Sequence, residues 1–580
     1  MKTFANGILG LFVGLLCGIT SAQTAGLPPA VNARQPHAQS QGQPLRSSMY
    51  EYLASEEGRA WMQVSGNPKS KALNQRFGQP SPAALERARV LLRNLSEQSP
   101  KSQTTLPAEP SSCGGAAGVR FNLEPRTNAV LQIQPSADFI LNGAGASSDL
   151  IVQIATDARG NLNNGTWDGS LSGYYVHTSS TADCSVQFEG GLPSFNNTLG
   201  LGAVSVVADP VRGAFFASDN RFVDGGAIFR VSTADLLNPA KCPPGTHTEA
   251  QAESCWMQTP PVQIDPTYQS YIDPVLAVDE RASGTGAGDV YLVGEGESMF
   301  IVACTNLLNC SPIENIDTNN GQEYAFVRVR PDGIITISYM RLIPGGLSET
   351  VLYVTCTPAG APKPPVCGSP VTVATATSLA AYQPPNLGPV GSAYAQHINR
   401  LESDGSFTTF LVYDGCTNLY TPPPPPNDPP TYCVGSSVFM SFSTNNGQTW
   451  SPPVSVDNKN GFHVFPTITN DASTGNVGIV HLSNEGDYFE HDTRVVVNRI
   501  LPGTTTLSPS VAVTSFTSNT NFPALGIGGG ADSFMGAAAR GTGIAGQSHL
   551  YLSFDSIAVD GMYNGEALPE LNNQIKLIVY

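Results

Sequence analysis

The stretch Ser441–Trp450, which reads Ser-Phe-Ser-Thr-Asn-Asn-Gly-Gln-Thr-Trp, predicts a strand, a tight turn and a second strand. The apolar run Val438–Met440 leads into it and belongs to the first of these strands. Asn445–Gly447 holds the residue types that a turn uses where the backbone enters left-handed conformations. We expect Thr449 and Trp450 to open the return strand, because β-branched and aromatic side chains suit a pleated surface.

The pattern Ser-x-Asn-x-Gly-x-Thr-Trp, carried by Ser443, Asn445, Gly447, Thr449 and Trp450, resembles the Asp box (BNR repeat) of sialidase-like β-propellers. In that family the box is a hairpin clip on the rim of a blade, in which an acidic side chain caps backbone N–H groups and an aromatic ring packs beneath. Asn445 stands where the family usually has Asp, and it offers one carbonyl oxygen for the same capping. The resemblance implies a structural role for these residues, away from any active centre.

A second pattern recurs between Cys113 and Tyr580: an apolar strand, a turn with Asp or Gly, and a second strongly apolar strand. The copies lie at 204–216, 274–293, 326–337, 398–407 and 466–480, with looser copies around 150–160 and 535–552. They begin about every 50 to 70 residues, which is the length of a four-stranded blade with long loops. A single blade cannot bury both of its faces, so neighbouring blades must stack around an axis.

Residues 113–580 are therefore predicted to form an all-β, six- or seven-bladed β-propeller of sialidase-like type. An array of β-sandwiches is the competing fold. It would explain the alternation of apolar residues equally well. It would not explain why the strand–turn–strand pattern recurs and is followed by an Asp box at its distal end.

The N-terminal region predicts export followed by a small helical unit. Lys2, the apolar run Ile8–Leu16 and the small residues Thr20–Ala22 predict a secretory signal peptide over residues 1–22, which is too short to span a membrane. Residues 23–46 are predicted to be disordered, and residues 99–112 form a Pro/Ser/Thr linker. Between them, residues 47–98 predict a small α-helical N-terminal extension, with Ser81 as a cap and Pro82 in the first turn. The extension either packs on the main domain or acts as a propeptide or docking segment.

The composition and charge of the chain limit which classes of partner it can bind. The 580 residues include 29 Lys and Arg against 46 Asp and Glu, a formal net charge of −17. An acidic chain without a basic run argues against a nucleic-acid partner, because phosphates require neutralisation by Lys and Arg. The 58 Gly, the 46 Pro and the 13% of charged residues are typical of a large exported all-β protein. We expect a secreted protein, extracellular or periplasmic, without a membrane span; its oligomeric state is left open.

Cysteine usage agrees with export. Ten cysteines follow the predicted signal peptide: Cys113, Cys184, Cys242, Cys255, Cys304, Cys310, Cys356, Cys367, Cys416 and Cys433. An even number in an exported protein indicates disulfides. We expect the close pairs 242/255, 304/310, 356/367 and 416/433 to close loops within blades, which leaves 113/184 as a longer bridge. The paired Cys-x-x-Cys spacing of a zinc site is absent, and no metal site is predicted.

Sialidase-type catalysis would require three arginines that hold a carboxylate, a Tyr activated by a Glu, and an Asp acid. Tyr488 with Glu490 is the candidate for the Tyr/Glu couple. The Phe/Tyr-Arg-Ile-Pro motif of the family is missing. Arg328, Arg330 and Arg341 are close in sequence, yet a clamp needs arginines from different blades, so we interpret them as rim or surface charges. The sequence leaves the catalytic residues unknown, with Tyr488 and Glu490 as candidates.

The sequence leaves two questions open: whether the protein binds calcium, and whether it is an enzyme. The oxygen-rich turns Asp157–Gly165 and Asp317–Glu323 make calcium conceivable, but neither has the full twelve-residue pattern with a terminal bidentate Glu. One function is that of a glycoside hydrolase acting on extracellular glycans. The alternative is a non-catalytic propeller that binds an extracellular glycan or protein.

Overall fold

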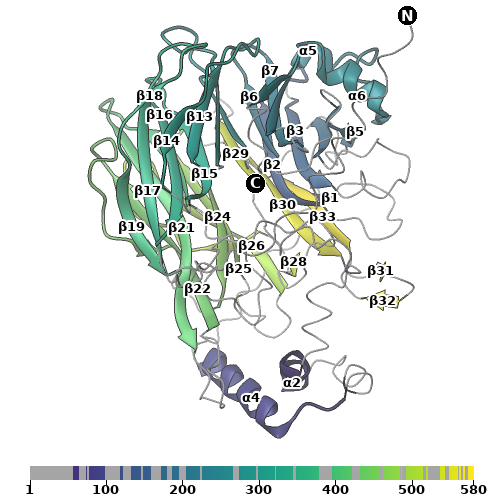
Figure 1. Ribbon diagram of the computed structural model, residues 1–580, viewed down its shortest axis with the longest axis vertical. Helices are drawn as coiled ribbons and strands as arrows, with labels where there is room; N and C mark the ends of the chain where they lie inside the picture. The colour runs from purple at the N-terminus through teal and green to yellow at the C-terminus, as the bar shows by residue number, and fades with distance from the viewer. Residues whose placement is uncertain are drawn as a thin grey trace, which may run out of the picture.

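The computed structural model shows a protein built almost entirely of β-strands, with a few short helices (Figure 1). The residues described are 56–64, 74, 78–97, 118–121, 132–145, 148–157, 172–178, 186–194, 204–221, 225–264, 274–295, 298–319, 322–343, 348–377, 395–420, 432–457, 461–483, 485, 492–513, 518–519, 536–541, 548–558, 561–563, 566–568 and 572–579.

Seven sheets of four or five strands hold nearly all of the described strands, and each sheet is named here by its innermost strand. The first three sheets are β2 (Gln132–Ile140), β3 (Leu150–Asp157), β4 (Ser172–Thr178), β5 (Val186–Gly191) and β9 (Gly245–Thr246); β6 (Ser205–Asp209), β7 (Ala214–Asn220), β8 (Gly226–Ser232) and β10 (Val262–Ile264); and β11 (Val275–Val278), β12 (Val290–Glu295), β13 (Met299–Cys304) and β14 (Glu314–Asp317).

The next three sheets follow in chain order. They are β15 (Gln322–Val329), β16 (Ile335–Leu342), β17 (Ser348–Thr357), β18 (Val366–Cys367) and β19 (Val371–Thr377); β20 (Ala395–Leu401), β21 (Phe407–Tyr420), β22 (Tyr432–Ser443) and β23 (Val454–Ser455); and β24 (His463–Asn470), β25 (Val477–Ser483), β26 (Asp492–Ile500), β27 (Val511–Ala512) and β28 (Ser518–Asn519).

The seventh sheet joins the two ends of the domain. It runs β29 (Gly536–Gly541), β30 (Ser548–Ala558), β33 (Asn572–Val579) and β1 (Gly118–Phe121), so its outermost strand comes from the start of the domain. β1 pairs with β33 in the register Val119 to Ile578. A separate hairpin is formed by β31 (Gly561–Tyr563) and β32 (Glu566–Leu568), and two short helices, α5 (Thr233–Leu236) and α6 (Glu249–Trp256), follow β8 and β9.

The innermost strands close a ring. In the order β2, β6, β11, β15, β20, β24 and β29, each contacts the next, and β29 contacts β2 again. The sheets are therefore radial blades around a common axis, which makes the fold a β-propeller, and the sheet order gives it seven blades. Because β1 completes the last blade, the ring is closed by hydrogen bonds between the two ends of the domain.

The core lies between blades rather than inside any one of them. One buried cluster joins Phe216 of the β6 sheet to Leu292 of the β11 sheet, and the next joins Ile301 of the β11 sheet to Ile337 of the β15 sheet. These side chains are excluded from water only when neighbouring blades are stacked, which is the expected origin of stability in a radial repeat.

Polar side chains on the innermost strands also connect blades. Asp138 accepts a hydrogen bond from the backbone N–H of Ala208 at 2.8 Å, and Ser205 accepts one from the N–H of Leu276 at 3.1 Å. Both N–H groups belong to the first strand of the next blade. The side chains thus satisfy buried backbone donors that the ladder within the sheet leaves unpaired.

The recurring strand–turn–strand pattern predicts the blade hairpins correctly at its five clear copies. Each of these copies coincides with the first and second strands of a sheet, from β6/β7 to β24/β25. The looser copy around residue 150 is misplaced, because it falls on β3, the second strand of its sheet. β2 reads Gln-Ile-Gln-Pro-Ser-Ala-Asp-Phe-Ile. Its first half is polar, so a pattern based on apolar runs does not predict it as a strand.

The turn at residues 444–450 is present, with φ of 59° at Asn446 and 79° at Gly447. The prediction that Thr449 and Trp450 open the return strand is wrong. The strand that returns is β23, which pairs with Phe439 and Met440 of β22. The Thr449 N–H donates to the Asn445 side chain at 3.0 Å inside the turn, so it is not available for the ladder.

Two helices, α2 (Glu56–Val64) and α4 (Pro82–Glu97), lie in the predicted N-terminal extension and pack against each other. Figure 1 shows them at one end of the molecule, beyond the tip of β22. The Ser81 hydroxyl accepts a hydrogen bond from the Ala84 N–H at 3.2 Å, as a helix cap does. Glu56 of α2 accepts from the Ser81 N–H at 2.6 Å, which ties the two helices together. Among the described residues, no helix has the length and apolar character needed to cross a membrane.

Three of the predicted disulfides are present: Cys242–Cys255, Cys304–Cys310 and Cys356–Cys367. Each links residues of one blade and its loops, which confirms the expectation of local bridges for these pairs. Cys416 is also disulfide-bonded. The side chain of Cys433 and the whole of Cys113 and Cys184 lie outside the described residues.

Candidate functional site

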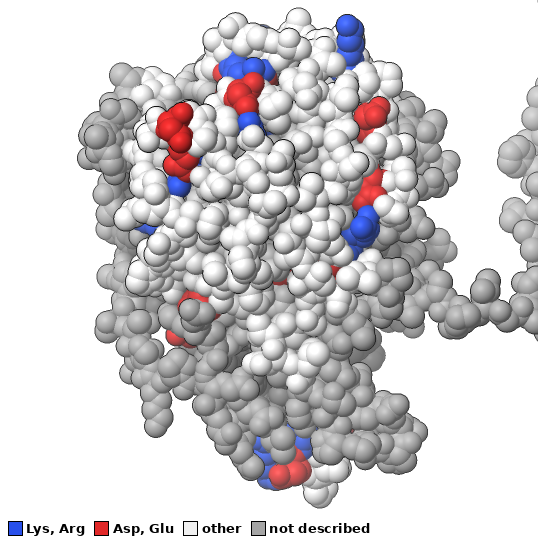
Figure 2. Space-filling view, turned by 90° about the vertical axis from the view of Figure 1, so that its left-hand side faces the viewer, with Lys and Arg blue, Asp and Glu red and all other residues white. Residues whose placement is uncertain are grey.

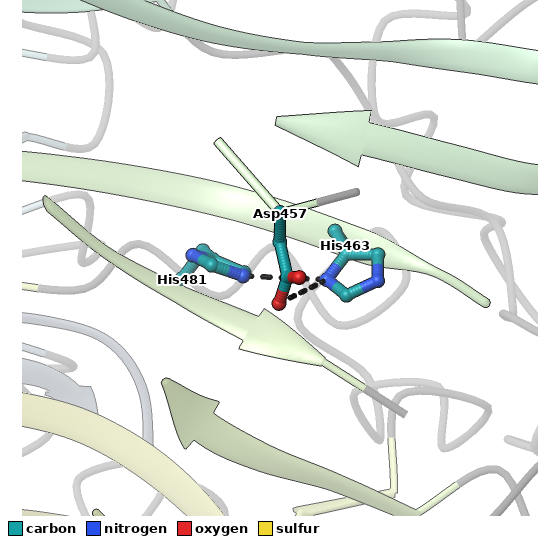
Figure 3. Close-up of side chains that lie close together, drawn as sticks. All are labelled: Asp457, His463 and His481. Atoms are coloured by element: carbon teal, nitrogen blue, oxygen red, sulfur yellow. Dashed lines mark hydrogen bonds and ion pairs between the residues drawn. The ribbon is translucent and has the colours of Figure 1, made fainter. Parts of the chain in front are cut away.

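A buried cluster of Asp457, His463 and His481 is the only group of three or more potential metal-ligating side chains found among the described residues (Figure 3). Asp457 follows β23, His463 is the first residue of β24, and His481 lies near the end of β25. The three side chains thus meet where the chain crosses from the last strand of the β20 sheet into the β24 sheet. This crossing lies on the opposite face of the ring from the turns that join the first and second strands.

The ligand atoms of the cluster face one another. His463 Nδ1 lies 3.3 Å from His481 Nε2 and 3.8 Å from Asp457 Oδ2. One candidate atom from each residue can be chosen so that all three lie within 4.8 Å of one another. His463 and His481 are 0% exposed and Asp457 is 5% exposed.

Hydrogen bonds from neighbouring serines hold the backbone of the cluster. The Ser436 hydroxyl donates to the His463 carbonyl at 3.0 Å and accepts from the His463 N–H at 3.1 Å. The Ser455 hydroxyl donates to the Asp457 carbonyl at 2.8 Å. The backbone positions of two of the three residues are therefore fixed by β22 and β23, the outer strands of the preceding blade.

An irregularity in β24 follows the cluster directly. The register of β24 with β25 shifts between Val464 and Thr467, and Phe465 adopts a left-handed φ of 55°. The Phe465 N–H donates to Asp414 of β21 at 2.9 Å. A non-glycine residue in this conformation is strained, and the bond to a buried carboxylate offsets part of that cost.

The chemistry open to this cluster is limited by its burial. Two imidazole nitrogens and a carboxylate oxygen are ligands suited to a transition-metal ion, and the same groups can also share a proton. Direct contact with a bulky substrate is excluded for side chains that are 95% or more covered. The arrangement therefore supports ion binding or a buried proton-sharing network rather than attack on a glycan.

The residues that carry the Asp-box resemblance form a self-capped turn. Ser443 accepts from the Gly447 N–H at 3.0 Å, and Asn445 accepts from the Thr449 N–H at 3.0 Å. The Trp450 indole donates to the Gly447 carbonyl at 3.0 Å, and its ring packs edge-on against Tyr353 of the neighbouring blade at 5.1 Å. These contacts are all within the turn or with the preceding blade, so the turn contributes packing and not a reactive group.

The arginines near the blade turns connect blades and do not converge on the axis. Four arginines, here called the rim arginines, lie at or near the turn between the first and second strands of their blades, and each donates to a turn of the next blade. The contacts are Arg212 Nη2 to the Arg281 carbonyl at 2.9 Å, Arg281 Nη1 to the Asp332 carbonyl at 2.9 Å, Arg330 Nη1 to Asn446 Oδ1 at 2.8 Å, and Arg400 Nη1 to the Leu501 carbonyl at 3.0 Å.

Arg330 lies at the rim, in agreement with its interpretation as a rim or surface charge, but its side chain is only 6% exposed. Its guanidinium pairs with Asp332 and stacks over the Phe407 ring at 4.2 Å. The reason is the facing turn of the next blade, which covers it and which the sequence alone does not place.

The turn at Asp317, considered for calcium, is engaged in a different way. Asp317 Oδ2 accepts from the Tyr339 hydroxyl at 2.8 Å and from Arg341 at 3.0 Å. Burial acts to raise the pKa of Asp317, but the hydrogen bonds from Asn319 and Tyr339 and the charge of Arg341 lower it below its ordinary value. A calcium ion here would have to displace a guanidinium. The other turn considered for calcium, Asp157–Gly165, lies largely outside the described residues.

Two further titratable groups are buried on the strands. Burial raises the pKa of Asp219 to about 6 against the opposing charge of Arg221, with which it pairs at 2.8 Å. Burial, with a smaller effect from the charge of Arg328, lowers the pKa of His397 to about 3. Its ring nitrogens contact the hydroxyls of Ser338 and Thr336 at 2.8 and 2.7 Å, so it is a hydrogen-bonded core residue between two blades.

Tyr488 and Glu490, the catalytic candidates from sequence, lie outside the described residues, and their role stays a prediction. The sequence does not predict the Asp457–His463–His481 cluster, because the zinc pattern considered there is paired Cys-x-x-Cys spacing. Its members are separated by 6 and 18 residues and form no motif. One signal was available, since His481 interrupts the otherwise apolar strand Val477–Leu482.

A shallow groove of about 540 Å³ lies at the outer edge between the β6 and β11 sheets. Its lining includes Val262 and Ile264 of β10 and Leu308, Cys310 and Ile313 of the loop after β13. The lining residues include no Asp, Glu, His, Lys, Arg or Tyr.

Comparison with solved structures finds proteins with a similar overall shape but little sequence identity. The polysaccharide lyase Uly1 matches with 9% identity over 84% of this chain and 95% of that chain, at a TM-score of 0.35. The Dos1 propeller matches with 10% identity over 61% and 66%, at 0.30. The catalytic domain of an α-L-arabinofuranosidase from Coprinopsis cinerea matches with 14% identity over 53% and 90%, at 0.26.

No protein-family profile matches the sequence, and no curated protein does so either. At the identities and scores above, the structural matches carry no inference about activity. The sheet order and the contacts between innermost strands identify the chain as a β-propeller on their own.

Proposed function

We propose that this protein is exported and binds uncharged extracellular glycans, free or on glycoproteins, without sialidase-type catalysis. The glycan class comes from the resemblance of residues 443–450 to the Asp box of sialidase-like propellers. The observation that carries the rest of the proposal is that the rim arginines are committed to contacts between blades. Fold alone does not fix function, whereas these side chains and the charge of the protein limit which ligands it can hold.

A sialidase-type site needs arginines that are free to hold the carboxylate of an anionic sugar. Arg330 is bound to Asp332 and Asn446, and Arg341 is bound to Asp317. Removing either guanidinium from its carboxylate to hold a ligand would cost the existing ion pair. Neither Arg330 nor Arg341 is therefore free to serve in a clamp for a sialic acid.

Charge favours an uncharged ligand. The net charge of −17 repels anionic polysaccharides at long range, and no basic run offsets it. Figure 2 shows the side of the molecule that lies on the left in Figure 1, and on its described part charged side chains are few and mostly occur with both signs together. This face therefore shows no cluster of one sign with which to attract a charged glycan.

Export is supported by the cysteines. Three disulfides lie in short loops at blade edges, and bridges of this kind persist in oxidising compartments and are rare in reducing ones. Together with the signal-peptide pattern of residues 1–22, this favours an extracellular or periplasmic location.

A glycan array combined with a turnover assay tests the proposal. We expect binding to uncharged glycans, weaker or no binding to sialylated ones, and no hydrolysis of fluorogenic sialosides or neutral glycosides. The alternative is a glycoside hydrolase, and it would show turnover that is lost in Tyr488→Phe or Glu490→Gln. Selective binding to sialylated glycans would overturn the charge argument.

A further inference from the structure

We propose that Asp457, His463 and His481 bind a transition-metal ion, with Zn²⁺ as the best fit, at the crossing between the β20 and β24 blades. The proposal is independent of the glycan function. It rests on the ligand types, their spacing, their burial and an unsatisfied carboxylate oxygen.

The spacing of the donor atoms matches a zinc site. With metal–ligand distances of about 2.0–2.1 Å and tetrahedral angles, ligand atoms stand about 3.3 Å apart. His463 Nδ1 and His481 Nε2 are 3.3 Å apart, and Asp457 Oδ2 is 3.8 Å from His463 Nδ1. Asp457 Oδ2 is thus about 0.5 Å farther from His463 Nδ1 than a tetrahedral zinc site requires. Figure 3 shows the carboxylate and both rings directed toward a common point.

The carboxylate gives a second and independent indication. Asp457 Oδ2 is buried and receives no hydrogen bond among the described residues. A buried carboxylate oxygen without a donor is costly, because it loses its hydration and gains nothing in return. A divalent cation between the carboxylate and the two imidazoles removes this cost. A proton shared between the two rings would leave Oδ2 without a hydrogen bond.

The ligand set also selects the class of metal. Two neutral imidazoles with one carboxylate suit zinc and its first-row neighbours, whereas calcium and magnesium prefer oxygen ligands alone. The serine contacts to the backbone of Asp457 and His463 keep these ligands in place before the ion arrives. Three protein ligands leave the fourth position of a tetrahedral ion to water.

The ion would tie two blades together. Asp457 follows the last strand of one blade, while His463 and His481 belong to the first and second strands of the next. A metal that binds only the folded ring raises its stability in proportion to the logarithm of the metal concentration. The role is therefore structural, in keeping with side chains that no substrate can reach.

The test uses the full-length exported protein, produced without a histidine tag, and measures bound metal by mass spectrometry. We expect about one zinc per chain in the wild type and less than about one tenth of that in His463→Gln and His481→Gln. Asp457→Asn keeps the size of the side chain, and we expect its zinc affinity to fall at least about tenfold. The matched control is His397→Gln, which alters a buried histidine outside the cluster and should keep its zinc.

Folding is followed in parallel, because a variant that does not fold would lose metal for a trivial reason. Chelation of the wild type should lower its melting temperature, and added Zn²⁺ should restore it; the same treatments should leave folded His481→Gln unchanged. Co²⁺ in place of Zn²⁺ should give the visible absorption of a tetrahedral site. Equal zinc in the wild type and the cluster variants, or wild-type protein that takes up no zinc after chelation and re-addition, would overturn the proposal.

Discussion

At the scale of single residues, Gly447 shows how tightly the turn after β22 is specified. Its φ is 79°, and a Cβ built on it would lie 2.3 Å from the Tyr353 ring of the neighbouring blade. The position therefore requires glycine for two reasons, its backbone conformation and the approach of an aromatic ring from another blade. The sequence predicts the first reason through the Asn-Asn-Gly turn pattern, but not the second.

We predict that Gly447→Ala lowers the free energy of unfolding by about 2 kcal/mol or more, since it adds both backbone strain and a clash with the ring. Urea unfolding followed by tryptophan fluorescence measures this change. Gly405→Ala is the matched control, because Gly405 also has a positive φ but has nothing within 4 Å of the built Cβ. An equal loss in the two variants would mean that the approach of Tyr353 contributes nothing.

His397 gives a prediction about pH. Its pKa is about 3 in the folded protein and 6.5 at its ordinary value, so the unfolded chain binds the proton more readily. A depressed pKa contributes stability that is present above pH 6.5 and is lost as the pH falls toward 3. The loss due to this group is at most about 1.4 kcal/mol per pH unit within that window.

Comparison with His397→Gln isolates this contribution. The variant loses hydrogen bonds to Ser338 and Thr336, so it is less stable at pH 7.5, but its stability should fall less steeply between pH 6.5 and pH 4. Urea unfolding of both proteins at several pH values measures the difference. Parallel pH dependence in the two proteins would contradict a neutral, buried His397.

At the scale of elements, the rim arginines form contacts from each blade to the next. Arg330 is the clearest case, because its guanidinium reaches the left-handed Asn446 in the turn of the next blade at 2.8 Å. The contact couples the self-capped turn of residues 443–450 to the preceding blade. It also explains how an otherwise local turn contributes to the assembly of the ring.

A double-mutant cycle tests this coupling. Arg330→Met removes the donor, and Asn446→Gly removes the acceptor while it keeps a residue that tolerates a positive φ. We expect each change to cost about 1–2 kcal/mol of unfolding free energy and the pair to show a coupling of about 1 kcal/mol. The exposed Arg89→Ala of α4 serves as the control and should be close to neutral. Strict additivity of Arg330→Met and Asn446→Gly would show that the contact carries no energy.

The elements also show what the sequence could and could not predict. The hairpins from β6/β7 to β24/β25 can be recognised in the sequence as a recurring apolar strand–turn–strand pattern, because strands buried on both faces must be apolar throughout. β2 has a polar first half, so the apolar pattern does not reveal it, and the copy expected around residue 150 falls on β3 instead. The cluster at Asp457, His463 and His481 joins three separate elements, and no local spacing rule relates such residues. The same is true of Arg330 and Asn446, which are 116 residues apart.

At the scale of the whole molecule, stability comes from closure of the ring. The five larger hydrophobic clusters among the described residues each lie between two blades, so a blade at an open end would expose one apolar face. Closure requires the strand at the start of the domain to complete the last blade. That pairing joins residues more than four hundred positions apart, and nothing in the local sequence of β1 predicts its partner.

Cross-linking across this closure tests the central claim most directly. In the register of β1 with β33, Val119 lies opposite Ile578, and Leu577 lies opposite Arg120. Facing positions on antiparallel strands are about 4.5–5.5 Å apart at Cα, within disulfide range, whereas positions offset by one point to opposite faces. A closed ring with this register predicts that Val119→Cys with Ile578→Cys forms an intramolecular disulfide, detected by peptide mass spectrometry, and that Val119→Cys with Leu577→Cys does not. A folded protein in which neither pair cross-links, or both do so equally, would contradict a closed ring with this register.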